Sequence, residues 1–107
     1  MTETLWTAAE VAIATSGNLV GDNTWKATGI AFDSRDVKVG DLFIAMVGEH
    51  ADGHDYVSKA FENGAVAAIV SREIDGVDAQ IVVNDTFESL QDLGQIARHR
   101  APLQKVI

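Results

Sequence analysis

The sequence predicts an α/β fold, with a small mixed or mostly parallel β-sheet flanked by helices. Two apolar runs, residues 42–47 and 65–70, show no polar alternation, which is typical of strands buried on both faces of a sheet. A segment with helical spacing lies between them, so strand, helix and strand form a βαβ unit. A second helical pattern begins near residue 85 and predicts a long helix after the last strand.

Size and charge narrow the class of protein. The chain has 107 residues, which fits one domain with a single core. Its formal net charge of −8 argues against nucleic acid as a partner, because that binding rests on a basic surface. The first residues lack the basic stretch and apolar segment of a secretory signal, and the sequence has no cysteine and no run near the roughly 18 apolar residues of a membrane span. We therefore expect a cytoplasmic monomer that binds neither nucleic acid nor membranes.

The first third of the chain predicts a short helix, two strands and a turn. Thr7 and Glu10 have the spacing of a capping box, and Gly17 is expected to end the helix that they open. Both capping residues are therefore assigned a structural role. Strands are expected at residues 19–20 and 27–33, followed by a turn at residues 38–41.

The remaining elements alternate between helix and strand. Asp55 is the expected N-cap of the helix in the βαβ unit, and residues 63–64 are expected to end it. A further strand is predicted at residues 79–83, and Asp85 opens the long helix, which Pro102 ends. The residues expected to face the core are Val57, Ala60 and Phe61 on the first helix and Phe87, Leu90, Leu93, Ile96 and Ala97 on the second.

Two polar clusters predict a ligand site. Residues 33–35 follow the strand expected to end near residue 32, and residues 48–54 follow the strand expected to end near residue 47. Ligands of open α/β sheets bind beyond the carboxyl ends of the strands, so two parallel strands would bring both clusters to one pocket. Ser34 supplies a hydroxyl and Arg35 a guanidinium, while Gly48 and Gly53 allow close backbone approach. Together with free N–H groups at the next helix, these groups suit a small anion or a nucleotide diphosphate.

Other interpretations of these residues remain open. Asp33, Ser34 and Arg35 can form a purely structural turn, which is the better interpretation when the loops are considered alone. A metal site is a second alternative, with ligands from Glu49, His50, Asp52, His54 and Asp55. His99 lies near a helix end between two arginines, which favours capping over chemistry. The sequence contains no nucleophile elbow and no G-x-x-x-x-G-K-[ST] phosphate loop, and we find no credible active site in it.

Residues 33–70, DSRDVKVGDLFIAMVGEHADGHDYVSKAFENGAVAAIV, resemble the N-terminal domain of the Mur ligases, which extend the peptidoglycan stem peptide. The blocks D-[ST]-R, G-D-L-F-[VI]-A and G-E-x-x-D-G-H-[DE]-[FY] occur in one consistent order, and the resemblance extends over about residues 5–83. The opening Leu5-Trp6-Thr7 is most similar to the MurF type, which adds D-alanyl-D-alanine to the UDP-N-acetylmuramoyl tripeptide. The MurE type, which adds the third stem residue, is the alternative.

The resemblance implies that this domain binds the UDP portion of the muramoyl peptide. Ser34 matches the family position whose hydroxyl contacts the nucleotide, and Glu49, His50 and Ala51 match the loop at the uridine end. Asp52 and His54 match a block that is expected first to shape that loop. Two positions depart from the family pattern. His50 replaces a frequent arginine, which puts a permanent cation there in doubt, and Val39 replaces a frequent proline.

The resemblance also implies a division into domains. Residues 1–105 are expected to form the N-terminal UDP-muramoyl-peptide-binding domain, and residues 106–107 to begin the central ATP-binding domain of a longer protein; a frayed natural C-terminus is the alternative. Its partners would be the muramoyl peptide and its own central and C-terminal domains. No cofactor is expected in this chain, whereas the full-length ligase would use ATP and magnesium. A stand-alone metal-dependent enzyme and a scaffold module that binds no nucleotide are the competing classes.

Overall fold

The computed structural model describes residues 6–48 and 52–100, the last five of them by backbone alone. Its main sheet has five strands in the order β2-β7-β6-β5-β4. These are β2 (Asn18–Gly21), β4 (Gly29–Ala31), β5 (Asp41–Ile44), β6 (Ala67–Val70) and β7 (Ala79–Val82). Strands β4 to β7 pair in parallel and β2 joins β7 antiparallel at the edge. The prediction of a small, mostly parallel sheet flanked by helices is confirmed.

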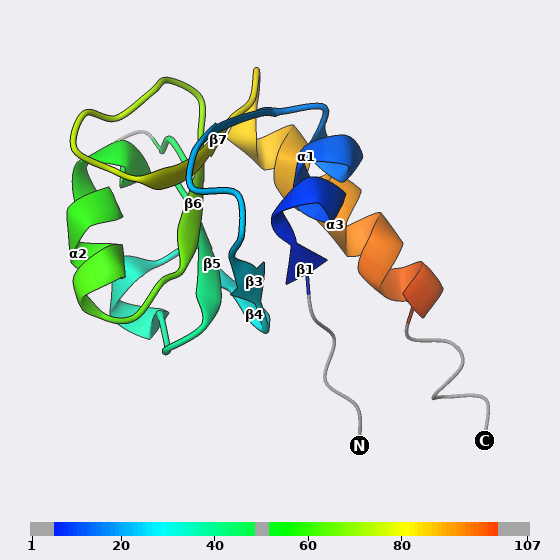
Figure 1. Cartoon of the computed structure of the whole chain (residues 1–107), viewed down its shortest axis with the longest axis horizontal. Helices are drawn as coiled ribbons and strands as arrows, with labels where there is room; N and C mark the ends of the chain where they lie inside the picture. Colours follow the sequence, from blue (N-terminus) through cyan, green and yellow to red (C-terminus); the bar gives the residue numbers. More distant parts are fainter. Residues whose placement is uncertain (1–5, 49–51, 101–107) are drawn as a thin grey trace.

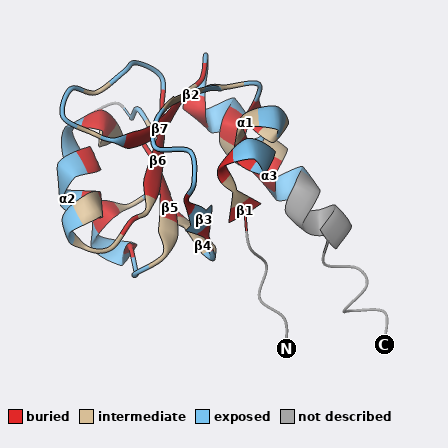
Figure 2. Ribbon diagram, in the orientation of Figure 1, coloured by how far each residue is buried: buried red, intermediate tan, exposed pale blue. Residues whose placement is uncertain are grey.

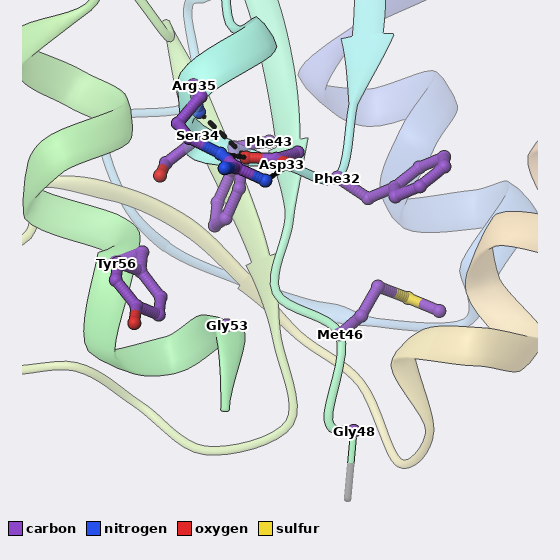
Figure 3. Close-up of a pocket in the computed structure, with 9 residues that line it drawn as sticks. All are labelled: Phe32, Asp33, Ser34, Arg35, Phe43, Met46, Gly48, Gly53 and Tyr56. Carbon is purple, nitrogen blue, oxygen red and sulfur yellow. Dashed lines mark hydrogen bonds and ion pairs between the residues drawn. The ribbon is translucent and has the colours of Figure 1, made fainter. Parts of the chain in front are cut away.

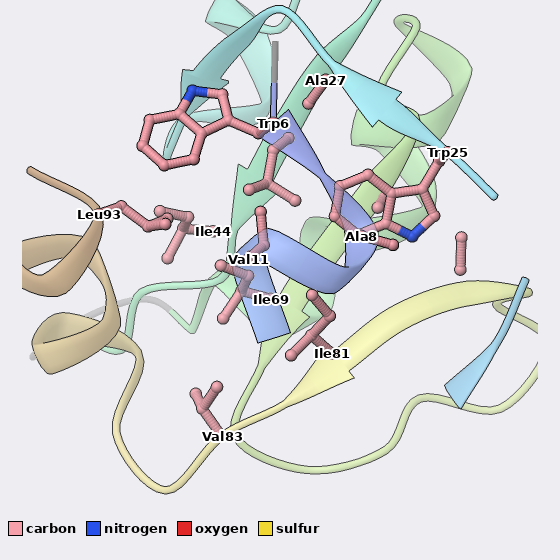
Figure 4. Packing of buried hydrophobic residues seen from close by; sticks show 13 residues of the cluster. Trp6, Ala8, Val11, Trp25, Ala27, Ile44, Ile69, Ile81, Val83 and Leu93 are labelled. Atoms are coloured by element: carbon pink, nitrogen blue, oxygen red, sulfur yellow. The ribbon is translucent and has the colours of Figure 1, made fainter. Parts of the chain in front are cut away.

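Helices cover both faces of this sheet (Figure 1). Helix α2 (Val57–Glu62) lies on one side, and α1 (Ala8–Thr15) and α3 (Thr86–Arg100) lie on the other. On the α1 and α3 side, Val11 and Leu93 belong to one hydrophobic cluster with Ile44 (Figure 4). On the α2 side, Val57 belongs to a second cluster with Phe43. Successive residues of β5 are therefore buried on opposite faces, as the absence of polar alternation predicts.

The N-terminal segment confirms the capping box and corrects the helix end. Thr7 Oγ1 accepts from the backbone N–H of Glu10 at 3.2 Å, and Glu10 Oε1 accepts from that of Thr7 at 3.0 Å. The residue that leaves the helix is Ser16, with a left-handed φ of 58°, and not Gly17. Gly17 instead donates its N–H to the carbonyl of Ala12 at 3.0 Å, so the two residues form the C-terminal motif together.

The strand expected at residues 27–33 is wrong in extent. Residues 26–27 form β3 (Lys26–Ala27), which pairs with β1 (Trp6–Thr7) in a separate two-stranded ribbon. The chain then enters β4 after Thr28, whose N–H donates to Gly40 at 2.9 Å outside the ladder. Asp33 ends the extended segment because its side chain caps the 3₁₀ helix η1 (Ser34–Asp36).

The βαβ unit is present as β5, α2 and β6, but its cap is not Asp55. The side chain of Asp52 caps the preceding 3₁₀ helix η2 (Gly53–Tyr56), which runs directly into α2. Strand β5 also ends at Ile44, earlier than expected. Ala45 still donates its N–H to Ile69 O at 2.9 Å, and the chain leaves the ladder at Met46, whose carbonyl accepts from Gly53 N at 2.7 Å instead.

The long helix begins as predicted and differs on one side chain. Asp85 accepts from the backbone N–H of Phe87 at 2.8 Å, so it opens α3. Leu90 and Leu93 pack against the sheet, whereas Phe87 is 54% exposed and does not belong to the core. The side chains of Ile96 and Ala97, and all of Pro102, lie outside the described part.

Figure 2 shows the buried residues concentrated in the sheet and on the inner helix faces. None of the helices in residues 6–48 and 52–100 is long and apolar enough to cross a bilayer.

Candidate functional site

The parallel pairing of β4 and β5 brings the two polar clusters to one edge of the sheet. A pocket of about 530 Å³ lies there, between the turn after β4 and the segment after β5 (Figure 3). It is lined by Phe32, Asp33, Ser34, Arg35, Phe43, Met46, Gly48, Gly53 and Tyr56. The prediction that both clusters contribute to one pocket is therefore confirmed in geometry.

Asp33 and Arg35 form a local ion pair on the pocket wall. Arg35 donates to Asp33 Oδ1 from its backbone N–H (2.9 Å) and Nε (3.0 Å), and to Oδ2 from Nη2 (2.7 Å). These side-chain hydrogen bonds from Arg35, followed by the backbone one, lower the pKa of Asp33 to about 2. The structural turn is thus present, but it does not use the whole guanidinium, because Nη1 has no partner among the described residues. The Arg35 side chain is 85% exposed, so Nη1 can reach a ligand.

Ser34 is held by its backbone and keeps its hydroxyl available. The residue is only 7% exposed, and its carbonyl accepts from Asn63 Nδ2 at 2.8 Å at the end of α2. Its hydroxyl makes no hydrogen bond within residues 6–48 and 52–100. A hydroxyl on a fixed backbone at a pocket wall is suited to bind a polar ligand, as the sequence predicts.

The second cluster is only partly in the pocket. Gly48 and Gly53 line it, whereas Asp52 and His54 do not. Glu49, His50 and Ala51 lie outside the described residues. Gly53 packs so closely that an added Cβ would lie 2.7 Å from Met46 N and 2.8 Å from Met46 O. The close backbone approach expected of this glycine is therefore made to the chain itself.

His54 is buried and both of its ring nitrogens are engaged. Nε2 accepts from the backbone N–H of Ser71 at 2.8 Å, and Nδ1 lies 2.6 Å from Asp52 Oδ1. A backbone N–H can only donate, so Nε2 is the acceptor and the ring proton lies on Nδ1, facing Asp52. The pKa of Asp52 is lowered to about 2, first by the backbone hydrogen bond from His54, then by its side chain and by Arg72.

These contacts weaken the metal alternative for His54, since neither ring nitrogen has a free lone pair. Three or more His, Cys, Asp or Glu side chains that could hold a metal ion do not come together anywhere in the described ranges. Glu49 and His50, which the alternative also needs, lie outside those ranges.

Sequence reasoning missed the apolar rim of the pocket. Phe32 is 59% exposed and Tyr56 is 47% exposed, and both line the pocket with Met46. Phe32 follows β4 and Tyr56 ends η2, so the rim joins two elements that are far apart in the sequence. The sequence offered one signal, because each aromatic residue adjoins a polar cluster, but it predicts Phe32 only as part of the strand at residues 27–33.

Comparison with known proteins gives the family. The family model described as Mur ligase family, catalytic domain, matches residues 26–104. The UDP-N-acetylmuramoyl-tripeptide–D-alanyl-D-alanine ligase of Rickettsia prowazekii is 39% identical over 99 residues, covering 91% of this chain and 21% of that protein. The UDP-N-acetylmuramoyl-L-alanyl-D-glutamate–2,6-diaminopimelate ligase of Syntrophomonas wolfei is 54% identical over 65 residues, covering 59% of this chain and 13% of that protein.

Solved structures of the same family share the fold of this chain. A crystal structure of MurF from Acinetobacter baumannii superimposes with a TM-score of 0.82 at 37% identity, over 94% of this chain and 22% of that chain. The chain spans about a fifth of the length of these D-alanyl-D-alanine-adding relatives. The family match covers most of the chain and the sequence resemblance is confirmed: the chain belongs to the Mur ligase family.

Proposed function

We propose that this chain is the domain that holds the UDP portion of a peptidoglycan precursor in a ligase of the D-alanyl-D-alanine-adding type. The observation that carries the proposal is the pocket at the carboxyl edge of β4 and β5. It combines two exposed aromatic rings with a serine hydroxyl and a guanidinium nitrogen that have no partner among the described residues. A nucleoside diphosphate has matching parts: a flat base, ribose hydroxyls and two phosphates.

Each part of the ligand has a complementary group in the pocket. The rings of Phe32 and Tyr56 offer faces against which a uracil base can stack. The Ser34 hydroxyl and Arg35 Nη1 can bind ribose or phosphate oxygens. Local donors are needed because the net charge of −8 supplies no general attraction for an anion. Roles for Glu49, His50 and Ala51 at the uridine end remain a prediction from the resemblance.

Binding the nucleotide here would serve chemistry elsewhere in a longer protein. Interactions with a remote part of a substrate can position its reacting group, which in this proposal is the carboxylate of the stem peptide. We place the substrate domain at residues 1–105, and ATP and magnesium in the full-length ligase. The matching family model is described as a catalytic domain. We nevertheless propose binding, because neither hydroxyl of the described pocket wall, that of Ser34 or that of Tyr56, makes a hydrogen bond to a base among the described residues.

The diaminopimelate-adding type is the second candidate, because one ligase of that type has the higher sequence identity to this chain over a shorter segment. The Syntrophomonas wolfei ligase reaches 54% identity, but over only 59% of this chain. The Rickettsia prowazekii ligase matches 91% of the chain at 39% identity. We favour the D-alanyl-D-alanine type because its similarity extends over nearly the whole chain. Assays of the full-length protein with each amino component decide between them.

An amide chemical-shift titration tests the binding role directly. The chain is titrated with UDP and with the UDP-muramoyl tripeptide, and Ser34→Ala is compared with Ser58→Ala, which removes an exposed hydroxyl outside this pocket. We expect saturable shifts around residues 32–35, 48 and 53–56, and weaker binding only for Ser34→Ala. Unmoved amides at millimolar UDP would contradict the proposal for the isolated chain. We also propose that the chain alone has no ligase or ATPase activity, and ATP turnover that depends on the tripeptide would contradict this.

A further inference from the structure

Two backbone contacts join the two ends of the segment that forms one wall of the pocket. Gly53 N donates to Met46 O at 2.7 Å, and Val47 and Asp52 form an isolated antiparallel bridge. Met46, Gly48 and Gly53 all line the pocket, so these backbone contacts hold the wall that faces Asp33 and Arg35 (Figure 3).

Hydrogen bonds connect Asp52 and His54, at one end of this wall, to Ser71 and Arg72, which follow β6. Asp52 Oδ1 accepts from the backbone N–H of His54 at 2.9 Å and from its Nδ1 at 2.6 Å. Arg72 Nη1 donates to the other carboxylate oxygen of Asp52 at 3.2 Å. Ser71 donates its backbone N–H to His54 Nε2 at 2.8 Å, and its Oγ lies 3.1 Å from the same nitrogen.

Ser71, His54 and Asp52 have the order of contacts found in Ser-His-Asp hydrolases. The chemistry of a hydrolase requires His54 Nε2 to take the proton from the serine hydroxyl. That nitrogen has one lone pair in the ring plane, and the backbone N–H of Ser71 already donates to it at the shorter distance. The arrangement therefore holds two segments together and does not activate a nucleophile.

We propose that Ser71 and Arg72 are positioning residues for the nucleotide pocket, acting through His54 and Asp52. Neither residue lines the pocket, so any effect on a ligand there must pass through the wall that they hold. The inference rests on the proposed function, because it concerns affinity for the nucleotide. It assigns a role to residues that lie outside both polar clusters predicted from the sequence.

The expected effect follows from populations. If the wall adopts several positions, the apparent affinity falls by the fraction of molecules that have the binding-competent one. Removing the Ser71 hydroxyl and the Arg72 side chain leaves only the backbone contact to His54. The Ser71 hydroxyl shares the lone pair of His54 Nε2 with the backbone N–H, so its loss adds little. Loss of the exposed Arg72–Asp52 ion pair should weaken UDP binding by about two- to fivefold. Ser71 and Arg72 are both exposed, so we expect the double variant to fold.

The test compares matched pairs of variants of the whole chain, with UDP as the ligand. Ser71→Ala/Arg72→Ala removes the two side-chain contacts and keeps the backbone hydrogen bond from Ser71 to His54. Ser58→Ala/Lys59→Ala makes the same kind of change at exposed residues of α2, where Lys59 pairs only with Glu62 in the part that the structure describes. Ser71→Thr/Arg72→Lys keeps a hydroxyl and a cation and should restore affinity. Arg72→Ala alone serves if the double variant does not fold.

Affinity, thermal midpoint and the nitrogen-15 signature of the His54 ring are measured for each variant. Support requires weaker UDP binding in the double variant, recovery in Ser71→Thr/Arg72→Lys, and unchanged binding in the α2 control. The ring signature should report a neutral, Nδ1-protonated imidazole in the wild type. Wild-type affinity in the double variant, or equal weakening in the α2 control, overturns this inference alone. Absence of UDP binding by the wild-type chain overturns the proposed function and this inference together.

Discussion

Asn63 donates its side-chain amide to the carbonyl of Ser34 at 2.8 Å, across 29 positions of the sequence. The contact joins the end of α2 to η1, the turn that places the Ser34 hydroxyl on the pocket wall. Asn63 was predicted only to end a helix, and it also fixes the backbone of Ser34, the serine predicted to bind the nucleotide.

Replacing Asn63 with alanine should destabilise the fold and displace η1. The partly buried carbonyl of Ser34 would lose its partner from α2, at a cost of about 1–2 kcal/mol. Urea unfolding measures this loss, with Gln91→Ala on the exposed face of α3 as the control. Equal stability of Asn63→Ala and the control would contradict the anchoring role.

Two glycines should respond in opposite ways to alanine. At Gly53 the new Cβ would clash with the backbone of Met46, so we expect a loss of about 1–3 kcal/mol and a disturbed pocket wall. At Gly94, within α3, a Cβ meets nothing within 4 Å, and alanine should stabilise the helix by about 0.5–1 kcal/mol. Thermal and urea unfolding of both variants check this. If Gly53→Ala leaves the free energy of unfolding unchanged, the pocket wall can shift to accommodate the added Cβ.

Acid should weaken the fold partly through Asp52. Its pKa is about 2 in the folded chain, below the ordinary value of 3.8, so its contribution to stability is present above pH 3.8 and is lost as the pH falls toward 2. Asp52→Asn keeps an acceptor for His54 and removes this titration. Urea unfolding from pH 7 to pH 2 should therefore show a shallower acid decline for Asp52→Asn than for the wild type. The exposed Asp75→Asn is the control, and an identical decline in wild type and Asp52→Asn would contradict the assignment.

The aromatic rim should contribute to nucleotide affinity more than to stability. Phe32→Ala and Tyr56→Ala each remove an exposed ring, and loss of base stacking costs about 1–3 kcal/mol, which is about fivefold or more in affinity. Val39→Ala removes an exposed apolar side chain that does not line the pocket. Calorimetric titration with UDP measures all three variants. Full affinity in both aromatic variants would place the base away from the rim.

Local pattern was enough to predict most of the fold. The runs that became β5 and β6 are apolar on both faces, and the capping chemistry of Thr7 and Asp85 marked two helix starts. It failed where tertiary contacts compete with local preference. Asp55 has the residue type of a cap, yet α2 begins without a side-chain cap, and it is Asp52 that caps the preceding η2 and also binds Arg72.

The sequence by itself determined the α/β class, the family and the location of both polar clusters, because burial periodicity, capping and motif order are properties of neighbouring residues. Only the tertiary structure decided which side chains of those clusters face the pocket. Ser34 and Arg35 do, whereas His54 turns to Ser71, 17 residues later. The physical reason is that a buried imidazole must satisfy both ring nitrogens, and its partner on a neighbouring strand end becomes available only when the parallel sheet is assembled.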